Sequence, residues 1–71
     1  MTEEKEGLII DEINNWIMAA TVEYEEKGCN SLFYIKAIAT IRGMITALEL
    51  ATGKEYGYDE DGVYEIKEAE V

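Results

Sequence analysis

Residues 56–66 read YGYDEDGVYEI, and this segment sets the architecture of the C-terminal part of the chain. Aromatic and branched residues alternate with small or acidic residues on either side of an acidic turn that contains a glycine. This pattern is typical of two antiparallel strands, and we expect residues 60–62 to form a three-residue loop with a left-handed glycine. The resulting pairs, Tyr58 with Tyr64 and Tyr56 with Ile66, place four side chains on one face.

The same letters also match part of a calcium-binding loop. A loop of the EF-hand type has acidic ligands at positions one, three, five and twelve, and a glycine at position six. Aligned on Gly62, the chain matches at two aspartates and at Glu68, but position one is Gly57, which has no ligand. The two helices that would flank such a loop are also missing from the pattern. We therefore predict a β-hairpin over residues 55–67 and no metal site.

Upstream of the hairpin, residues 3–27 have the 3.6-residue period of an amphipathic helix. Gly28 is suited to the left-handed conformation that ends a helix, and Ser31 is suited to cap the next one. The apolar stripe of this helix is formed by Ile9, Ile13, Trp16, Ile17, Ala20 and Tyr24.

A second helix is predicted over residues 31–52, and it is apolar on all sides. It carries three charged side chains, Lys36, Arg42 and Glu49. These charges lie inside the apolar run, where a membrane-spanning helix would bear a large cost, so we expect no membrane insertion. A helix that is apolar all round is normally buried, and one amphipathic partner covers one side of it.

Small residues on the far side of this second helix suggest self-association. Ala39, Gly43 and Ala47 follow one another at intervals of four, which leaves a shallow groove that admits a closely packed helix. Either a second copy of the chain or the chain's own first helix or hairpin could fill this groove. We favour a homodimer, whose contact residues would be Ile35, Ala39, Gly43, Thr46, Ala47 and Leu50.

The predicted fold is therefore α+β, in a single domain over residues 1–71. An antiparallel two-helix hairpin is followed by a C-terminal β-hairpin, and homodimerisation completes the structure. A lone two-stranded hairpin is unstable in water, so its tyrosine face must pack on the helices or on another subunit.

Composition excludes several kinds of chemistry. The 71 residues include no histidine and one cysteine, Cys29, so an intrachain disulfide, a Cys/His zinc site and a histidine-activated nucleophile are all excluded. No glycine-rich phosphate loop is present, and we predict no enzyme activity and no cofactor. The first residues are acidic where a signal peptide would be basic, and a cytoplasmic location is expected.

Acidity is the strongest compositional signal, with a net charge of −10. Such a surface repels nucleic acid and favours a basic protein partner. The two helices are expected to run antiparallel, so the end of the second helix and the β-hairpin that follows it lie beside the start of the first helix. We therefore expect one acidic cluster there, with partner-binding residues Asp11, Glu12, Glu55, Asp59, Glu60, Asp61 and Glu65. The sharpest hypothesis is an inhibitor of the kind mobile elements encode, which mimics nucleic acid on a basic DNA- or RNA-binding partner. Two alternatives remain: a structural homo-oligomer or assembly subunit, and acidity that serves solubility alone.

Overall fold

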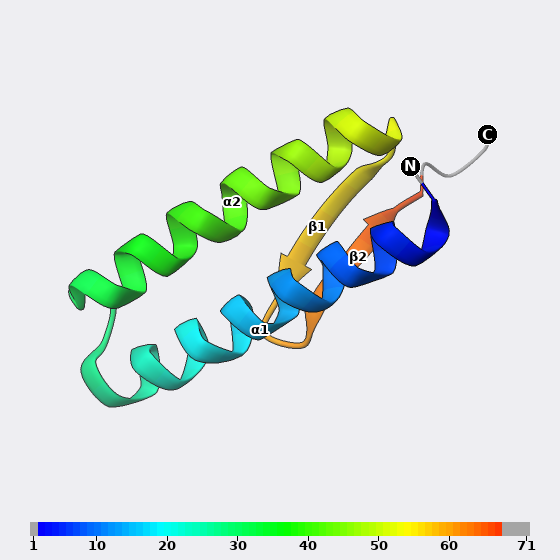
Figure 1. Ribbon diagram of the computed structural model, residues 1–71. Helices are drawn as coiled ribbons and strands as arrows, with labels where there is room; N and C mark the ends of the chain where they lie inside the picture. The colour runs from blue at the N-terminus through cyan, green and yellow to red at the C-terminus, as the bar shows by residue number, and fades with distance from the viewer. Residues whose placement is uncertain (1, 68–71) are drawn as a thin grey trace.

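Two helices and then two strands follow one another in the computed structural model, which describes residues 2–67 (Figure 1). The elements are α1 (Glu3–Lys27), α2 (Leu32–Thr52), β1 (Glu55–Asp59) and β2 (Gly62–Ile66). The strands form one antiparallel sheet. The predicted α+β order, a helical hairpin followed by a β-hairpin, is confirmed; Glu68, the last ligand of the rejected calcium loop, lies outside the described residues.

Local hydrogen bonds explain where the helices begin and turn. The Thr2 hydroxyl accepts the Lys5 amide at 3.2 Å, and the Ser31 hydroxyl accepts the Tyr34 amide at 3.3 Å, so each helix has an N-cap. The Ser31 hydroxyl also donates to Glu23 on α1, which ties the interhelix loop to the first helix.

The core lies between the two helices and under the hairpin. Its centre is Ile13 and Ile41, both fully buried, and Tyr56 adds an aromatic ring from β1. The remaining buried members are Ile17, Ala20, Ala37, Ile45 and Leu48. Each fully buried isoleucine contributes about 2 kcal/mol through removal of apolar area from water, so this small core provides much of the stability.

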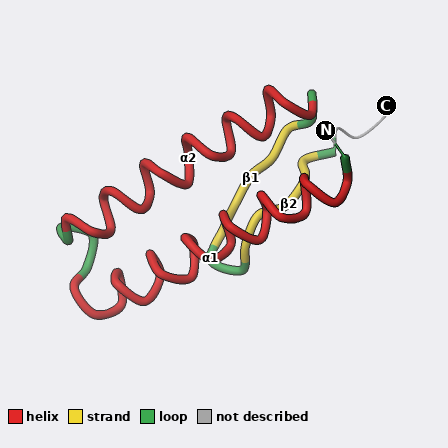
Figure 2. The backbone as a smooth tube through the Cα atoms, viewed as in Figure 1, coloured by secondary structure: helices red, strands yellow, loops and turns green. Residues whose placement is uncertain are grey.

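The hairpin folds back over the helices instead of extending away from them. β1 packs beside α2, and β2 packs beside α1 (Figure 2). The turn at residues 60–61 lies over the middle of α1, next to Asn14 and Thr21. The half of the helical pair nearest the interhelix loop therefore has no sheet over it (Figure 1).

The predicted pairing of the strands is wrong by one residue. Tyr58 lies opposite Val63 and Tyr56 lies opposite Glu65, so the turn has two residues, not three. This shift moves Tyr64 to the outer face, where its ring lies over Gly57; a Cβ at that glycine would be 2.8 Å from the ring. The helix-facing side consists of Tyr56, Tyr58 and Val63, while Ile66 is exposed.

Side chains from the helices hold both edges of the hairpin. Asn14 on α1 accepts the Val63 amide at 2.8 Å, and Glu49 on α2 accepts the Tyr56 amide at 3.0 Å. In an antiparallel ladder such outward amides have no partner within the sheet, and leaving one buried without a bond costs about 1 to 3 kcal/mol. These two contacts fix the hairpin in register on the helices.

Candidate functional site

The hairpin turn presents three consecutive acids, Asp59, Glu60 and Asp61, all of them exposed. The Asp59 carboxylate accepts the Asp61 amide at 2.8 Å, which orders the turn. The two ion pairs formed within residues 2–67 are Lys27 with Glu23 and Lys54 with Glu6. No described cation therefore neutralises the turn.

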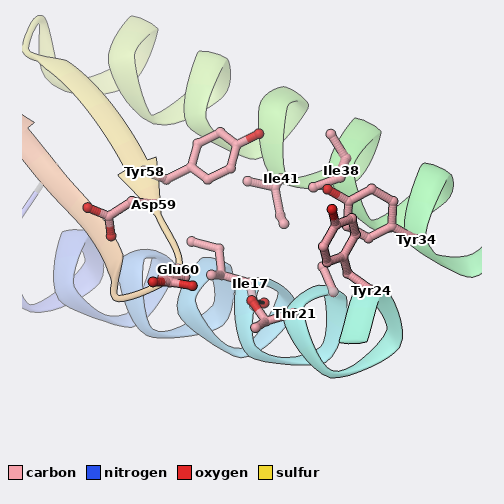
Figure 3. A pocket seen from close by; sticks show the side chains of 10 residues that line it. Ile17, Thr21, Tyr24, Tyr34, Ile38, Ile41, Tyr58, Asp59 and Glu60 are labelled. Atoms are coloured by element: carbon pink, nitrogen blue, oxygen red, sulfur yellow. Dashed lines mark hydrogen bonds between the residues drawn. The ribbon is translucent and has the colours of Figure 1, made fainter. Parts of the chain in front are cut away.

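A groove opens beside this turn, between the two helices (Figure 3). Its volume is about 220 Å³, and Glu60 stands at its rim. The Asp59 carboxylate points away from the opening and accepts the Asp61 amide (Figure 3). Tyr58 lies on one side of the opening, and a tyrosine pair from the two helices lies on the other, with ring centroids 5.3 Å apart. We call this the turn groove, and its apolar lining is Ile17, Tyr24, Tyr34, Ile38, Ile41 and Tyr58.

A second hollow lies on the α1 side of the same turn. It has a volume of about 210 Å³ and is lined by Met18 and Val22 together with Glu60 and Asp61. Both apolar side chains are more than half exposed. The acidic turn is thus bordered by open apolar surface on both sides, a combination suited to binding amphipathic segments.

Two of the other acids predicted to bind a partner, Glu55 and Glu65, lie away from the turn. Both lie at the opposite end of the hairpin, near Lys54. Asp11 and Glu12 are exposed on α1, and Glu12 borders a separate hollow beside Trp16, whose ring stacks on Phe33. The expected single acidic cluster is therefore wrong, because the hairpin folds back and carries its turn away from the start of α1.

A polar cluster at the start of α1, where β1 begins, was not predicted from the sequence. Glu6 accepts hydrogen bonds from the Tyr56 hydroxyl and from the Lys54 ammonium, the latter at 3.0 Å. The bond from Tyr56, followed by that from Lys54, lowers the pKa of Glu6. Burial and then the bond to Glu6 raise the pKa of Tyr56, and the bond to Glu6 raises the pKa of Lys54. The cluster anchors β1 to the start of α1.

These pKa shifts predict a pH-dependent contribution to stability. A carboxylate whose pKa is lowered in the folded state stabilises the fold at pH values above its ordinary pKa of 4.5. This contribution disappears as the pH falls through the folded-state pKa. Tyr56 and Lys54 have raised pKa values and stabilise the fold while they stay protonated. Their contribution is lost as the pH rises through their folded-state pKa values. Glu6→Gln should therefore lower the free energy of unfolding most between about pH 6 and pH 9.

Urea unfolding across the pH range checks this expectation, with Glu3→Gln as the matched control at an exposed position of the same first turn. A difference between wild type and Glu6→Gln that stays constant down to pH 3 would contradict the described contacts.

The outer face of α2 carries the residues predicted for self-association, and the structure leaves all six exposed: Ile35, Ala39, Gly43, Thr46, Ala47 and Leu50. Leu50 is 83% exposed. Apart from the helix's own backbone, no described atom lies within 4 Å of the position that a Cβ on Gly43 would occupy. The alternative that α1 or the hairpin fills this small-residue groove is therefore wrong for the described chain.

Residues 2–67 contain no group of three histidine, cysteine or acidic side chains placed to hold a metal ion. Cys29 is a free, exposed thiol. Neither described helix is long and apolar enough to cross a membrane. No family model, curated protein or solved structure matches this chain.

Proposed function

We propose that the protein is a small cytoplasmic binding module that attaches to a basic partner protein and has no catalytic role. The observation that carries the proposal is the hairpin turn, where Asp59, Glu60 and Asp61 stand without a described counter-ion between two apolar hollows. A partner's lysine or arginine side chains would supply the missing charge, and its apolar side chains would cover the hollows.

Electrostatic attraction would also speed the encounter. A protein of net charge −10 attracts a basic surface over roughly the Debye length, about 8 Å at physiological salt. Asp11, Glu12, Glu55 and Glu65 add to this field from the periphery without forming part of the turn. In the narrower form of the proposal, the partner's basic surface binds DNA or RNA, and the turn carboxylates take the place of phosphates, as in inhibitors encoded by mobile elements.

Capture of a partner from a lysate of the native host tests this function. Immobilised protein should retain one basic protein at about 50 mM salt and release it at about 500 mM salt, because charge-led contacts are screened. If the captured protein is acidic, or if it stays bound at the higher salt, the charge-led function is wrong.

A second proposal concerns the outer face of α2. We propose that two copies pair through this face, because Leu50 and Ile35 are more than half exposed beside the open surface at Gly43. Small residues allow the two backbones to approach closely, and burial of the flanking apolar side chains would stabilise the pair. A structural homo-oligomer with no inhibitory role is the corresponding alternative function.

Sedimentation equilibrium over a hundredfold range of concentration measures this association. The wild type should be a dimer, and Gly43→Leu should be a monomer or an aggregate, because a large side chain holds the helices apart. Lys36→Glu, at the edge of the face, should have a much smaller effect. A wild type that remains a cooperatively folding monomer throughout would exclude the homodimer.

A further inference from the structure

The hairpin covers only part of the face on which it lies. Each strand has five residues and so spans about 17 Å, whereas α2 has 21 residues and spans about 31 Å. The uncovered part lies between the turn and the interhelix loop, and the turn groove opens there (Figures 1 and 3). An open length of roughly 15 Å between two helices accommodates about three turns of a further helix.

The contacts at the hairpin edges favour a helix over an added strand. A strand would bind by pairing with free backbone groups at an edge. The Val63 amide is already bonded to Asn14, and the Tyr56 amide is already bonded to Glu49. The side chains of α1 and α2 therefore occupy donors that an incoming strand needs, while the groove between the helices stays open.

The lining of the turn groove specifies the chemistry of such a helix. Ile38 is partly exposed and forms the apolar floor on α2, with the fully buried Ile41 next to it, and Tyr24 and Tyr58 stand at opposite sides of the opening. A carboxylate borders one side alone, where the hairpin turn contributes Glu60. An occupant therefore needs apolar side chains along one stripe and cations on one flank of that stripe. Tyrosine faces add to the attraction for a cation held near them.

We propose that the turn groove binds an amphipathic helix of the basic partner, with its apolar stripe against Ile38 and the tyrosine rings and its lysine or arginine flank against Glu60. This inference rests on the proposed function and adds the form of the recognised segment. The expected motif has apolar residues at positions i, i+3 or i+4, and i+7, with basic residues beside them. Binding would place a third helix on the open half of the helical pair.

Two synthetic peptides of equal composition test the inference. The first is a helical peptide of about 11 residues, or three turns, with leucines at the expected spacing and lysines on one flank. The second contains the same residues in an order that removes the stripe. Fluorescence anisotropy with labelled peptides measures both affinities, and the first peptide should bind at least tenfold more tightly than its isomer.

Two tyrosine variants provide a matched pair. Tyr24 and Tyr64 are about equally exposed, at 52% and 49%, but Tyr24 lines the turn groove and Tyr64 lies on the outer face of the hairpin. Tyr24→Ser should weaken binding of the first peptide about tenfold, and Tyr64→Ser should not. When the first peptide is added to the wild-type protein, chemical shift changes in the amide NMR spectrum should fall on Ile38 and Ile41. This measurement locates the peptide without depending on how well a variant folds.

The result that overturns the inference is equal affinity for the two peptide isomers, or shift changes that fall outside the turn groove. If both isomers bind equally and charge reversal of the turn abolishes the binding of both, the proposed binding of a basic partner stands and the helix site is wrong. If the first peptide binds equally tightly after charge reversal of the turn, the proposed basic recognition is wrong as well.

Discussion

Replacing Gly62 with alanine should lower the free energy of unfolding by about 2 to 4 kcal/mol. Gly62 is buried and has a φ of 130°, in a region that favours glycine. A Cβ there would lie 2.9 Å from the Asn14 carboxamide oxygen. That oxygen accepts the Val63 amide, so the new methyl group would strain the backbone and displace an edge contact together. In a domain of this size, such a loss is a large fraction of the total stability.

Urea unfolding followed by circular dichroism measures the change, and Gly7→Ala is the matched control. Gly7 lies within α1 with open space around it, so alanine there should raise helix propensity and stabilise the fold by about 1 kcal/mol. The two glycine variants thus have opposite expected signs. Wild-type stability in Gly62→Ala would mean that the hairpin does not dock on Asn14 as described.

Charge reversal of the turn should abolish partner binding while the fold is retained. Changing Asp59, Glu60 and Asp61 to lysine puts three cations against a basic partner, and we expect affinity to fall at least about 100-fold at moderate salt, since close charge pairs couple by 1.5 kcal/mol or more. The fold should be little affected because the three side chains are exposed. The variant loses the Asp59 bond to the Asp61 amide, a small local contribution.

The matched control reverses three exposed acids elsewhere, Glu4, Glu25 and Glu26, and has the same net charge as the turn variant. If affinity depends on the turn, the control should bind the partner much more tightly than the turn variant does. Equal affinities for the two variants would show that overall charge, and not the turn, determines binding.

The helices are predictable because their signals are local. Ser31 caps α2 through the Tyr34 amide three residues on, and Gly53 ends α2 with a φ of 74°. The buried residues Ile13, Ile17 and Ala20 repeat at the helical period in the sequence itself. The existence and the order of the strands can be predicted equally well, because apolar and polar residues alternate on both sides of the segment DEDG, residues 59–62.

Register is not predictable in the same way, because a two-residue and a three-residue turn both fit the letters. The choice depends on contacts that are remote in sequence: Asn14 bonds the Val63 amide across 49 positions, and the Tyr64 ring needs the bare backbone of Gly57. An alternation pattern contains neither piece of information. The predicted tyrosine face was consequently wrong at Tyr64.

The candidate site was only partly accessible from the sequence for the same reason. Asp59, Glu60 and Asp61 are recognisable as a solvated turn, but the turn groove exists because the hairpin folds back and stops halfway along the helices. Glu6 and Tyr56 meet across 50 positions, and no short-range pattern connects them. The exposed outer face of α2, in contrast, was predictable from the sequence, because its small residues repeat at a short interval of four.

Calorimetric titration of the captured partner into the purified protein, repeated from about 50 to 500 mM salt, tests the central claim most directly. If the acidic turn recognises a basic partner, the dissociation constant of the wild type should rise at least about tenfold over this range, and the turn variant should show no measurable binding at any salt concentration. A dissociation constant that is independent of salt, or one that is unchanged in the turn variant, would contradict the claim.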